Sequence, residues 1–381
     1  MNEWREVELG KVAEGVSIYR KGWQECKLGD VVVLNYGKSL PERSRKEGNI
    51  PVYSSTGITG WHNVALVSTK GLIVGRKGTI GKVYKSLTPF FPIDTAYYIL
   101  PNDESYNLDF MFYLLSNAGL EELNEDSAVP GLNRDTAYSQ NILLPPIEEQ
   151  KAIASVLSAL DDKIDLLQRQ NRTLESLAQA LFRHWFSDGA GEDWEEKPLD
   201  AIATFLNGLA CQKYPPENEI DRLPVLKIKD LRSGLSEQSD WATSDVPEEY
   251  IVENGDVVFS WSGSLMVKIW DGNNCVLNQH LFKVTSEQYP KWFYYFWTVH
   301  HLQKFIAIAE SKATTMGHIK RADLSSSMTF IPAQAELDEM DQSFAPLIDK
   351  IVLNNQQIAS LTALRDTLLP KLMSGEVRVR V

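Results

Sequence analysis

Apolar residues recur through the middle of the chain at alternating steps of four and three. They are Ile153, Leu157, Leu160, Ile164, Leu167, Leu174, Ala178 and Leu181, with Asn171 in register between the last groups. This narrow stripe is typical of a helix that packs lengthwise against another helix. It continues for about five heptads, or roughly 50–55 Å of helix. Pro145 and Pro146 before the stripe and glycines after it predict that one long helix lies within residues 144–191.

The same pattern returns 187 residues later, in residues 331–375, where Glu336 corresponds to Glu149. Asp349-Lys350-Ile351 likewise corresponds to Asp162-Lys163-Ile164. Self-similarity at a fixed offset indicates duplication. The chain is therefore predicted to contain a domain (1–143), a central helix (144–191), a second domain (192–330) and a C-terminal helix (331–381).

Polar residues and prolines interrupt the helical stripes. Asn171 stands at an apolar heptad position, where a buried Asn costs stability but fixes the register of two helices. The alternative is that Asn171 lies in an exposed part of the stripe. In the second helix, Pro346 and Asn354 interrupt the pattern, and Pro346 predicts a break or kink followed by a shorter straight helix.

Both domains show a mixed α/β (α+β) pattern. In the first, Val31–Leu34, Leu72–Val74 and Tyr97–Leu100 are short apolar runs between turn residues and predict strands, whereas Phe110–Leu115 predicts a helix. The second domain repeats this order, with residues 256–264 in the place of 71–79 and 292–297 in the place of 110–115. A Trp-x-x-x-x-Leu opening occurs at Trp4, at Trp23 and, after the first long helix, at Trp194. Trp23 is the preferred equivalent of Trp194, which makes residues 1–20 an extra N-terminal piece.

Composition narrows the class of protein. The 381 residues carry a net charge of −13, which argues against a protein that coats nucleic acid indiscriminately. Three widely separated cysteines indicate neither a disulfide framework nor a zinc knuckle, and they fit a reducing cytoplasm. The six histidines lack metal-ligand spacing, so no metal site is expected. No apolar run reaches membrane-spanning length, and the charged N-terminus is unlike a signal peptide, so a cytoplasmic protein is expected.

Against this acidic background, residues 38–85 contain nine Lys or Arg and only two Glu, a local charge of +7. The basic residues are Lys38, Arg43, Arg45, Lys46, Lys70, Arg76, Lys77, Lys82 and Lys85. Acidic residues gather instead in the helices and around residues 103–126, 193–196 and 240–253. A local basic face on an acidic body favours specific DNA contact, and a solvated surface is the alternative.

Loops in the two domains offer the residue types that contact DNA. Lys and Arg pair with phosphates and guanine edges, and small hydroxyl residues and Gly let the backbone approach closely. The candidates are Lys38, Arg43, Arg45, Tyr53, Ser54, Ser55, Thr56, Arg76, Lys77, Thr79 and Arg134 in the first domain, and Lys213, Ser260, Trp261, Ser264, Lys312, Thr314, Thr315, His318, Lys320 and Arg321 in the second. One such loop alone is more often a simple turn, but matching positions in two copies favour DNA binding.

The sequence contains no complete catalytic motif of the common enzyme classes. Residues 75–83 resemble a phosphate-binding loop, but the spacing is wrong and Val83 replaces the required Ser or Thr. Leu144-Pro145-Pro146-Ile147 lacks the flanking residues of an amino-methyltransferase motif. Hydrolase elbows, zinc-protease motifs and dinucleotide fingerprints do not occur in the sequence, so no catalysis by this chain is expected.

In these features the chain resembles a DNA-specificity subunit of a Type I restriction–modification system. The resemblance covers nearly the whole chain and rests on two variable domains, each followed by a Leu-Pro-Pro-x-x-Glu-Gln-like entry and a long helix. The first helix matches with Leu144-Pro145-Pro146, Glu149-Gln150 and Leu160–Ile164. The second departs from it at Ala333, Leu337 and Pro346.

The resemblance implies two α/β target-recognition domains held apart by two antiparallel helices with pseudo-twofold symmetry. It implies a non-catalytic subunit that reads a bipartite double-stranded DNA sequence and docks two adenine methyltransferase subunits, joined by restriction subunits where these exist. S-adenosylmethionine, ATP and Mg²⁺ would belong to the partners. Asp162, Lys163, Asp349 and Lys350, at repeat-equivalent positions, are the candidate partner contacts.

Two other functional classes remain to be weighed. A coiled-coil adaptor with two protein-binding domains would account for the acidic charge and would show no dependence on DNA sequence. A stand-alone DNA-modifying enzyme is disfavoured by the missing catalytic motifs.

Overall fold

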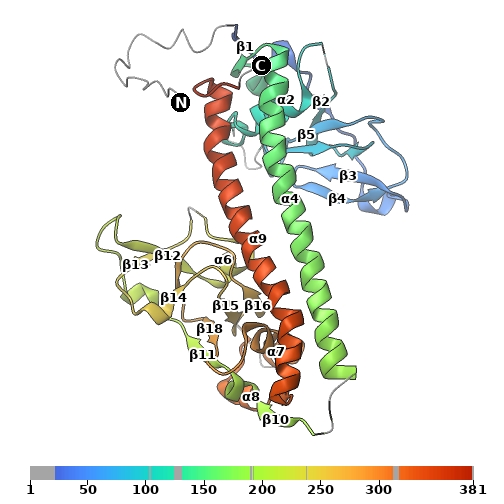
Figure 1. Ribbon diagram of the computed structural model, residues 1–381. Helices are drawn as coiled ribbons and strands as arrows, with labels where there is room; N and C mark the ends of the chain where they lie inside the picture. The colour runs from blue at the N-terminus through green and yellow to red at the C-terminus, as the bar shows by residue number, and fades with distance from the viewer. Residues whose placement is uncertain are drawn as a thin grey trace, which may run out of the picture. The chain divides into compact units, whose positions relative to one another are not determined.

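The computed structural model describes residues 22–102, 104–123, 131–188, 191, 193–236, 238–311 and 317–379 (Figure 1). By contacts it divides into two compact units. Unit 1 comprises Met1–Asp162 and Thr362–Val381, and unit 2 comprises Lys163–Leu361. The N-terminal and C-terminal parts of the chain thus share one unit, and each of the two long helices contributes residues to both units.

The described part of unit 1 contains three sheets, together with the helix α2 (Leu108–Ser116). The strand orders are β2 (Asn35–Tyr36)-β8 (Ala96–Ile99)-β5 (Gly71–Gly75)-β6 (Val83–Ser86), then β4 (Gly57–His62)-β3 (Ile50–Ser54)-β7 (Phe91–Pro92), and β1 (Gln24–Lys27)-β9 (Asn141–Leu144). The β3–β7 pair is parallel, and the other pairs between these strands are antiparallel.

Unit 2 repeats this topology around α7 (Lys291–Ser311). Its strand orders are β11 (Thr204–Asn207)-β18 (Leu281–Thr285)-β15 (Val257–Ser260)-β16 (Met266–Ile269), then β13 (Trp241–Thr243)-β12 (Arg222–Leu226)-β17 (Cys275–Leu277)-β14 (Ile251–Val252), and β10 (Glu195–Pro198)-β19 (Met328–Ile331). The β12–β17 pair is again parallel. The matching orders confirm the predicted duplication, with β14 as an addition in unit 2.

Shorter helices join the strands. They are α1 (Leu28–Val31), α3 (Arg134–Tyr138), α5 (Leu199–Ile202), α6 (Ile228–Ser233) and α8 (Arg321–Ser325), with 3₁₀ turns η1 (Glu42–Ser44), η2 (Leu120–Glu122), η4 (Cys211–Lys213) and η5 (Glu248–Tyr250). The strands predicted at Leu72–Val74 and Tyr97–Leu100 are confirmed in β5 and β8, and the helix predicted at Phe110–Leu115 is confirmed in α2.

The strand predicted at Val31–Leu34 is wrong. The segment begins with the last residue of α1 and continues as irregular chain. The Asp30 carboxylate accepts the Lys27 N–H at 3.1 Å, which closes a single helical turn before the apolar run. Val32 and Leu34 are buried whereas Val33 is 65% exposed. The run therefore shows the alternating burial of a strand without a neighbouring strand to pair with.

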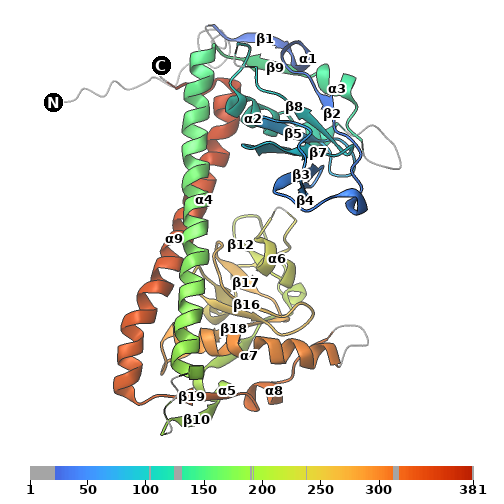
Figure 2. The same ribbon diagram turned by 90° about the vertical axis from the view of Figure 1, so that its right-hand side faces the viewer.

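The two long helices are α4 (Ile147–Arg183), which continues through a π-helical turn (His184–Asp188), and α9 (Gln334–Ser374). They lie side by side and run in opposite directions (Figures 1 and 2). The heptad residues of α4 are buried or half-buried, as the stripe predicts. The predicted break at Pro346 is wrong, because α9 continues through it. Phe344 and Ile348 on either side of Pro346 are buried in the core of unit 2, and this packing holds the helix despite the lost hydrogen bond.

Both units build their cores against these helices. In unit 1, Ile153 and Leu157 of α4 and Leu372 of α9 share a buried cluster with the apolar face of α2. In unit 2 the core is rich in aromatic rings, and Trp292 of α7 stacks on Phe344 of α9 with their centroids 4.2 Å apart. The helices are thus integral parts of both units rather than separate modules.

Within the described segments, no helix combines the length and apolar character that membrane crossing requires. The same residues contain no cluster of three or more His, Cys, Asp or Glu placed to hold a metal ion.

Candidate nucleic-acid interface

In unit 1, the loop after β5 lies against the segment that leads into α3. The Leu132 N–H donates to the Arg76 carbonyl oxygen at 2.8 Å, and an isolated β-bridge joins Lys77 to Gly131. The structure thereby brings the predicted loop at residues 76–79 beside the predicted loop that ends at Arg134. Two basic segments far apart in sequence form one surface.

An aromatic ring lies between the two arginines of this surface. The guanidinium carbon of Arg76 is 4.9 Å from the centroid of the Tyr36 ring, and that of Arg134 is 5.2 Å from the same centroid. Arg76 also lies 5.7 Å from the Tyr97 ring, and its Nη1 donates to the Asp94 carbonyl at 3.0 Å. Stacking on the ring limits the motion of each guanidinium fork. We call Tyr36, Arg76, Tyr97 and Arg134 the Tyr36 cluster; Tyr36 itself is 47% exposed.

A turn rich in hydroxyl groups borders the same surface. The N–H groups of Arg76 and Lys77 donate to the Thr95 carbonyl at 2.9 and 3.1 Å, and the Ser55 N–H donates to the Thr95 hydroxyl at 3.3 Å. Ser55 is buried, whereas Thr56 and Thr79 are exposed. The turn between β3 and β4 and the loop after β5 are therefore neighbours, as the prediction of one interface requires.

Unit 2 repeats the arrangement of loops. The Ile319 N–H donates to the Trp261 carbonyl at 3.1 Å, and an isolated β-bridge joins Ser262 to His318. The His318 and Trp261 rings meet edge to face at 6.2 Å. His280, in the turn before β18, has its Nδ1 3.1 Å from the Ser262 hydroxyl. The loop after β15 thus lies against the segment that leads into α8.

The side chains of this second surface form a different cluster. The Trp261 indole N–H donates to Asn207 Oδ1 at 3.0 Å, and its ring stacks on Phe282 with centroids 5.7 Å apart. Arg321 covers the Phe282 ring at 5.7 Å and donates to the Phe205 carbonyl at 3.1 Å. We call Asn207, Trp261, Phe282 and Arg321 the Trp261 cluster.

The two clusters occupy equivalent positions. Tyr36 faces Tyr97 in the β2–β8 ladder, and Asn207 faces Phe282 in the β11–β18 ladder. The corresponding pairs are Tyr36 and Asn207, Arg76 and Trp261, Tyr97 and Phe282, and Arg134 and Arg321. Only the last pair keeps its residue type. One scaffold therefore presents two different chemical surfaces.

A glycine follows the edge strand in both units for a steric reason. A Cβ on Gly37 would lie 2.1 Å from the Ile93 carbonyl oxygen, and one on Gly208 would lie 2.3 Å from that of Asn278. Any side chain would collide with backbone there. The glycines let the edge strand lie close enough to place Tyr36 and Asn207 in their clusters.

Four predicted DNA-contact residues have side chains covered by protein. Tyr53 is 7% exposed and packs edge to face on Phe90 at 5.8 Å, and Ser54, Ser55 and Ser260 are also buried. These side chains serve the core of each unit in this conformation. Arg45 is half-buried and donates to the Thr59 carbonyl at 2.6 Å, so it ties the η1 segment to β4.

The remaining predicted residues lie elsewhere on the surface or outside the described chain. Lys38, Arg43, Lys213, Ser264 and Lys320 are exposed and belong to neither cluster. Lys312, Thr314 and Thr315 lie outside the described residues. Sequence reasoning missed Tyr36, Asn207 and His280, and it placed Tyr97 only in a strand. The available signal was the Gly that follows both Tyr36 and Asn207.

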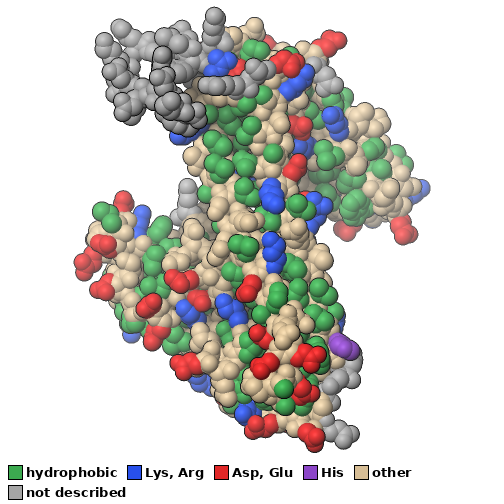
Figure 3. All heavy atoms as spheres, viewed as in Figure 1, with side chains coloured by type: hydrophobic (Ala, Val, Ile, Leu, Met, Phe, Trp, Pro, Cys, Tyr) green, Lys and Arg blue, Asp and Glu red, His purple; other side chains and the backbone are tan. Residues whose placement is uncertain are grey.

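Acidic side chains gather over the part of unit 2 that carries β13 and β14 (Figure 3). Asp240, Asp245, Glu248 and Glu249 are exposed there. This is the acidic region predicted at residues 240–253. Its charge repels phosphate, so DNA contact on this part of unit 2 is opposed by electrostatics.

The four candidate partner contacts, Asp162 and Lys163 on α4 and Asp349 and Lys350 on α9, are all exposed. The neighbouring Asp161 differs, because it accepts from Arg365 at 2.9 Å and from the Tyr113 hydroxyl at 2.6 Å. Burial and this bond to Asp161 raise the pKa of Tyr113. Asp161 is therefore a structural carboxylate, and Asp162 is available to a partner.

The family model described as Type I restriction modification DNA specificity domain matches residues 20–176 and 191–363. The Type I restriction enzyme MjaIX specificity subunit of Methanocaldococcus jannaschii is 26% identical, over 99% of this chain and 97% of its own length. The HindI specificity subunit of Haemophilus influenzae is 27% identical over 49% of this chain and 42% of its own. The crystal structure of the Type I restriction–modification S subunit from M. genitalium superposes with a TM-score of 0.62, at 16% identity, over 92% of this chain and 96% of its own.

Proposed function

We propose, because this chain belongs to the Type I restriction modification DNA specificity family, that its two units read two separate parts of one double-stranded DNA sequence. Membership makes the chain the non-catalytic specificity subunit of such a system, with DNA sequence recognition as its role. The observation that supports a divided target is the pair of equivalent clusters with different side chains. Identical clusters would favour a symmetric target, and these favour an asymmetric one.

The side chains of each cluster suit base reading. In the Tyr36 cluster, two guanidinium groups held on one exposed ring match the paired acceptors of a guanine edge or adjacent phosphates. In the Trp261 cluster, a single guanidinium, an indole and a phenyl ring, with the His318 imidazole beside the indole, offer fewer charged donors and more apolar contact. We therefore expect the two half-sites to differ in base composition.

The retained arginine pair allows a matched test. We expect Arg134→Ala to weaken methylation of one half-site and Arg321→Ala to weaken the other, each by roughly 5- to 150-fold, the range for one good bidentate base contact. The measurement is modified-base sequencing of host DNA from strains that carry each variant. Asp245→Ala, an exposed residue outside both clusters and both long helices, is the control and should leave the motif unchanged. Loss of the same half-site in both variants would contradict the assignment of one half-site per unit.

We further propose that the exposed faces of α4 and α9 hold two adenine methyltransferase subunits, with restriction subunits where the host encodes them. S-adenosylmethionine, ATP and Mg²⁺ would be bound by those partners. The support is the repeat-equivalent exposure of Asp162-Lys163 and Asp349-Lys350. Because the same exposed pair occurs in both repeats, we expect two copies of one partner rather than one copy each of two different partners.

Charge reversal tests this docking. Asp162→Lys and Asp349→Lys should each lower the methyltransferase content of the purified complex, and the double variant should lower it most. Native mass spectrometry of the co-expressed complex measures the stoichiometry. Asp245→Lys, on the acidic part of unit 2, is the control for a change of net charge. Unchanged stoichiometry in the double variant would make these residues ordinary surface.

A further inference from the structure

Two tyrosines at equivalent positions of the repeat have different surroundings. Tyr113 lies in α2, in the segment that corresponds to 292–297 of α7, so its counterpart is Tyr295. The Tyr113 hydroxyl donates to Asp161 Oδ2 at 2.6 Å and lies 3.5 Å from the Ser158 hydroxyl. In unit 1 this tyrosine is thus hydrogen-bonded to the long helix α4.

Unit 2 has neither the hydroxyl nor the carboxylate at the equivalent positions. The 187-residue offset places Ala345 at the position of Ser158 and Ile348 at the position of Asp161. Within the described chain, no hydrogen bond is made by the Tyr295 hydroxyl, although burial raises its pKa above the ordinary value. The two copies therefore differ: unit 2 keeps the tyrosine without the polar partners that it has in unit 1.

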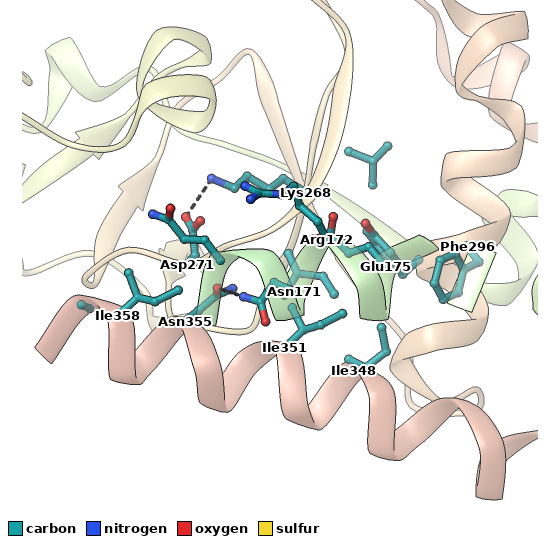
Figure 4. Close-up of a pocket in the computed structure, with 15 residues that line it drawn as sticks. Asn171, Arg172, Glu175, Lys268, Asp271, Phe296, Ile348, Ile351, Asn355 and Ile358 are labelled. Carbon is teal, nitrogen blue, oxygen red and sulfur yellow. Dashed lines mark hydrogen bonds and ion pairs between the residues drawn. The ribbon is translucent and has the colours of Figure 1, made fainter. Parts of the chain in front are cut away.

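A cleft of about 470 Å³ occupies this position in unit 2 (Figure 4). Residues of α4, α7, α9 and the strand β16 with its following turn line it. Phe296, Ile348 and Ile351 form an apolar wall, and the amide of Asn355 lies beside them. This volume is within the range of roughly 300–1,000 Å³ found for small-molecule sites.

Charged side chains of both signs face the cleft. Arg172 and Glu175 of α4 line it, and the Lys268–Asp271 ion pair, at 2.8 Å, forms the opposite side. Among the described residues, neither the Arg172 guanidinium nor the Glu175 carboxylate has a hydrogen bond or a close ion pair. Both residues are exposed to solvent, and partial desolvation raises the pKa of Glu175. A ligand that brings one negative and one positive group would pair with both side chains.

We propose that this cleft binds a small zwitterion with an apolar body, the chemical class of the apolar α-amino acids. Arg172 and the Tyr295 hydroxyl would bind the carboxylate, Glu175 would bind the ammonium group, and the Ile348 wall would cover the side chain. Charge-assisted hydrogen bonds at both ends supply specificity, and the apolar wall supplies affinity. The site stands on the geometry of unit 2 and is independent of how the chain reads DNA.

Three small molecules separate the contributions of the two charges. The full-length chain is titrated with L-phenylalanine, with phenethylamine, which lacks the carboxylate, and with hydrocinnamate, which lacks the amine. L-leucine serves as a second zwitterion. Ligand-detected NMR measures the dissociation constants. We expect both amino acids to bind at least tenfold more tightly than either truncated molecule. Absence of saturable binding of both amino acids at millimolar concentrations would overturn the proposal.

Substitutions then locate the binding. Arg172→Gln should lower the affinity for L-phenylalanine about tenfold without changing the affinity for phenethylamine, which has no carboxylate. Glu175→Gln should likewise lower the affinity for L-phenylalanine without changing the affinity for hydrocinnamate, which has no amine. Arg169→Gln, on the same helix but not in the cleft lining, is the control. Equal binding by Arg172→Gln, Glu175→Gln and the control would place the ligand elsewhere and refute the assignment.

Discussion

At the scale of single residues, Glu149 joins three separate parts of unit 1. Its side chain is 4% exposed, accepts from Arg378 at 2.6 and 2.8 Å, and accepts from the Trp23 indole at 3.0 Å. In unit 2, Glu336 accepts from Trp194 at 2.9 Å, which confirms Trp23 and Trp194 as equivalents. The Arg378 guanidinium holds the pKa of Glu149 below its usual range, although partial burial opposes this.

The lowered pKa gives the Glu149 contact a defined pH dependence. Because the folded-state pKa is depressed, the contact stabilises unit 1 above the unfolded pKa of about 4.3, and the stabilisation is lost as pH falls through the folded pKa. Glu149→Gln should therefore lower the thermal midpoint by a few degrees, on the order expected for one lost charged hydrogen bond, at pH 7 and by less near pH 3. Calorimetry at both pH values measures this. Glu336→Gln, which lacks an arginine partner, should show a smaller and flatter effect, and a pH-independent loss in Glu149→Gln would contradict the ionic explanation.

At the scale of elements, periodicity explains what the sequence could predict. A heptad stripe predicts α4 because apolar residues at a fixed spacing fall on one face along the whole helix. The 187-residue offset of the repeat then predicts α9 from the same pattern. The two clusters were harder to predict from the sequence, because Tyr36 and Arg134 meet only when the chain folds and brings β2, β5 and the segment before α3 together. No local pattern near Tyr36 records that convergence. The strand prediction at Val31–Leu34 was wrong for the same reason. Distant segments bury Val32 and Leu34, and this produces the alternating pattern of a strand in a segment that pairs with no described strand.

The Asn171 contact shows how the two long helices are matched in unit 2. Of the two alternatives, the structure shows the buried one: Asn171 is 8% exposed and Asn354 fully buried. Asn171 Nδ2 donates to Asn355 Oδ1 at 2.6 Å, and Asn354 Nδ2 donates to Asn171 Oδ1 at 2.8 Å. Among the residues that the structure describes, the buried Asn354 Oδ1 atom has no hydrogen-bond partner. The amide network therefore specifies one alignment at a cost in stability.

The cost of a partly satisfied network can be measured by a double-mutant cycle. Asn171→Leu should destabilise unit 2 by about 1–3 kcal/mol, because it leaves the buried Asn354 amide and the half-buried Asn355 amide unpaired. Adding Asn354→Leu should recover most of that loss, since an apolar pair needs no hydrogen bonds. Chemical denaturation of the full chain gives the free energies. Ser176→Leu, at an exposed position of α4, controls for added apolar area. Additive losses in the double variant would show that the asparagines do not act as one network.

At the scale of the whole molecule, each long helix contributes to both units without a break. Residues on both sides of the unit boundary at Asp162 and Lys163 belong to α4, and those on both sides of Leu361 and Thr362 belong to α9. Changes in helix length near these boundaries alter the number of residues between the two clusters and leave each cluster intact. We propose that this number sets the length of the unspecified DNA spacer between the two half-sites.

Inserting one heptad into α4 after Asp162 and one into α9 after Leu361 tests this proposal. Seven residues preserve the phase of the apolar stripe and add about 10 Å of helix at 1.5 Å per residue. DNA rises about 3.4 Å per base pair, so the spacer should lengthen by about three base pairs with both half-sites unchanged. Modified-base sequencing of host DNA reads the result directly. Paired insertions of five residues rotate the stripe out of phase and should reduce methylation without defining a new spacer. An unchanged spacer in a stable, active heptad variant would show that the helices do not set the distance between half-sites.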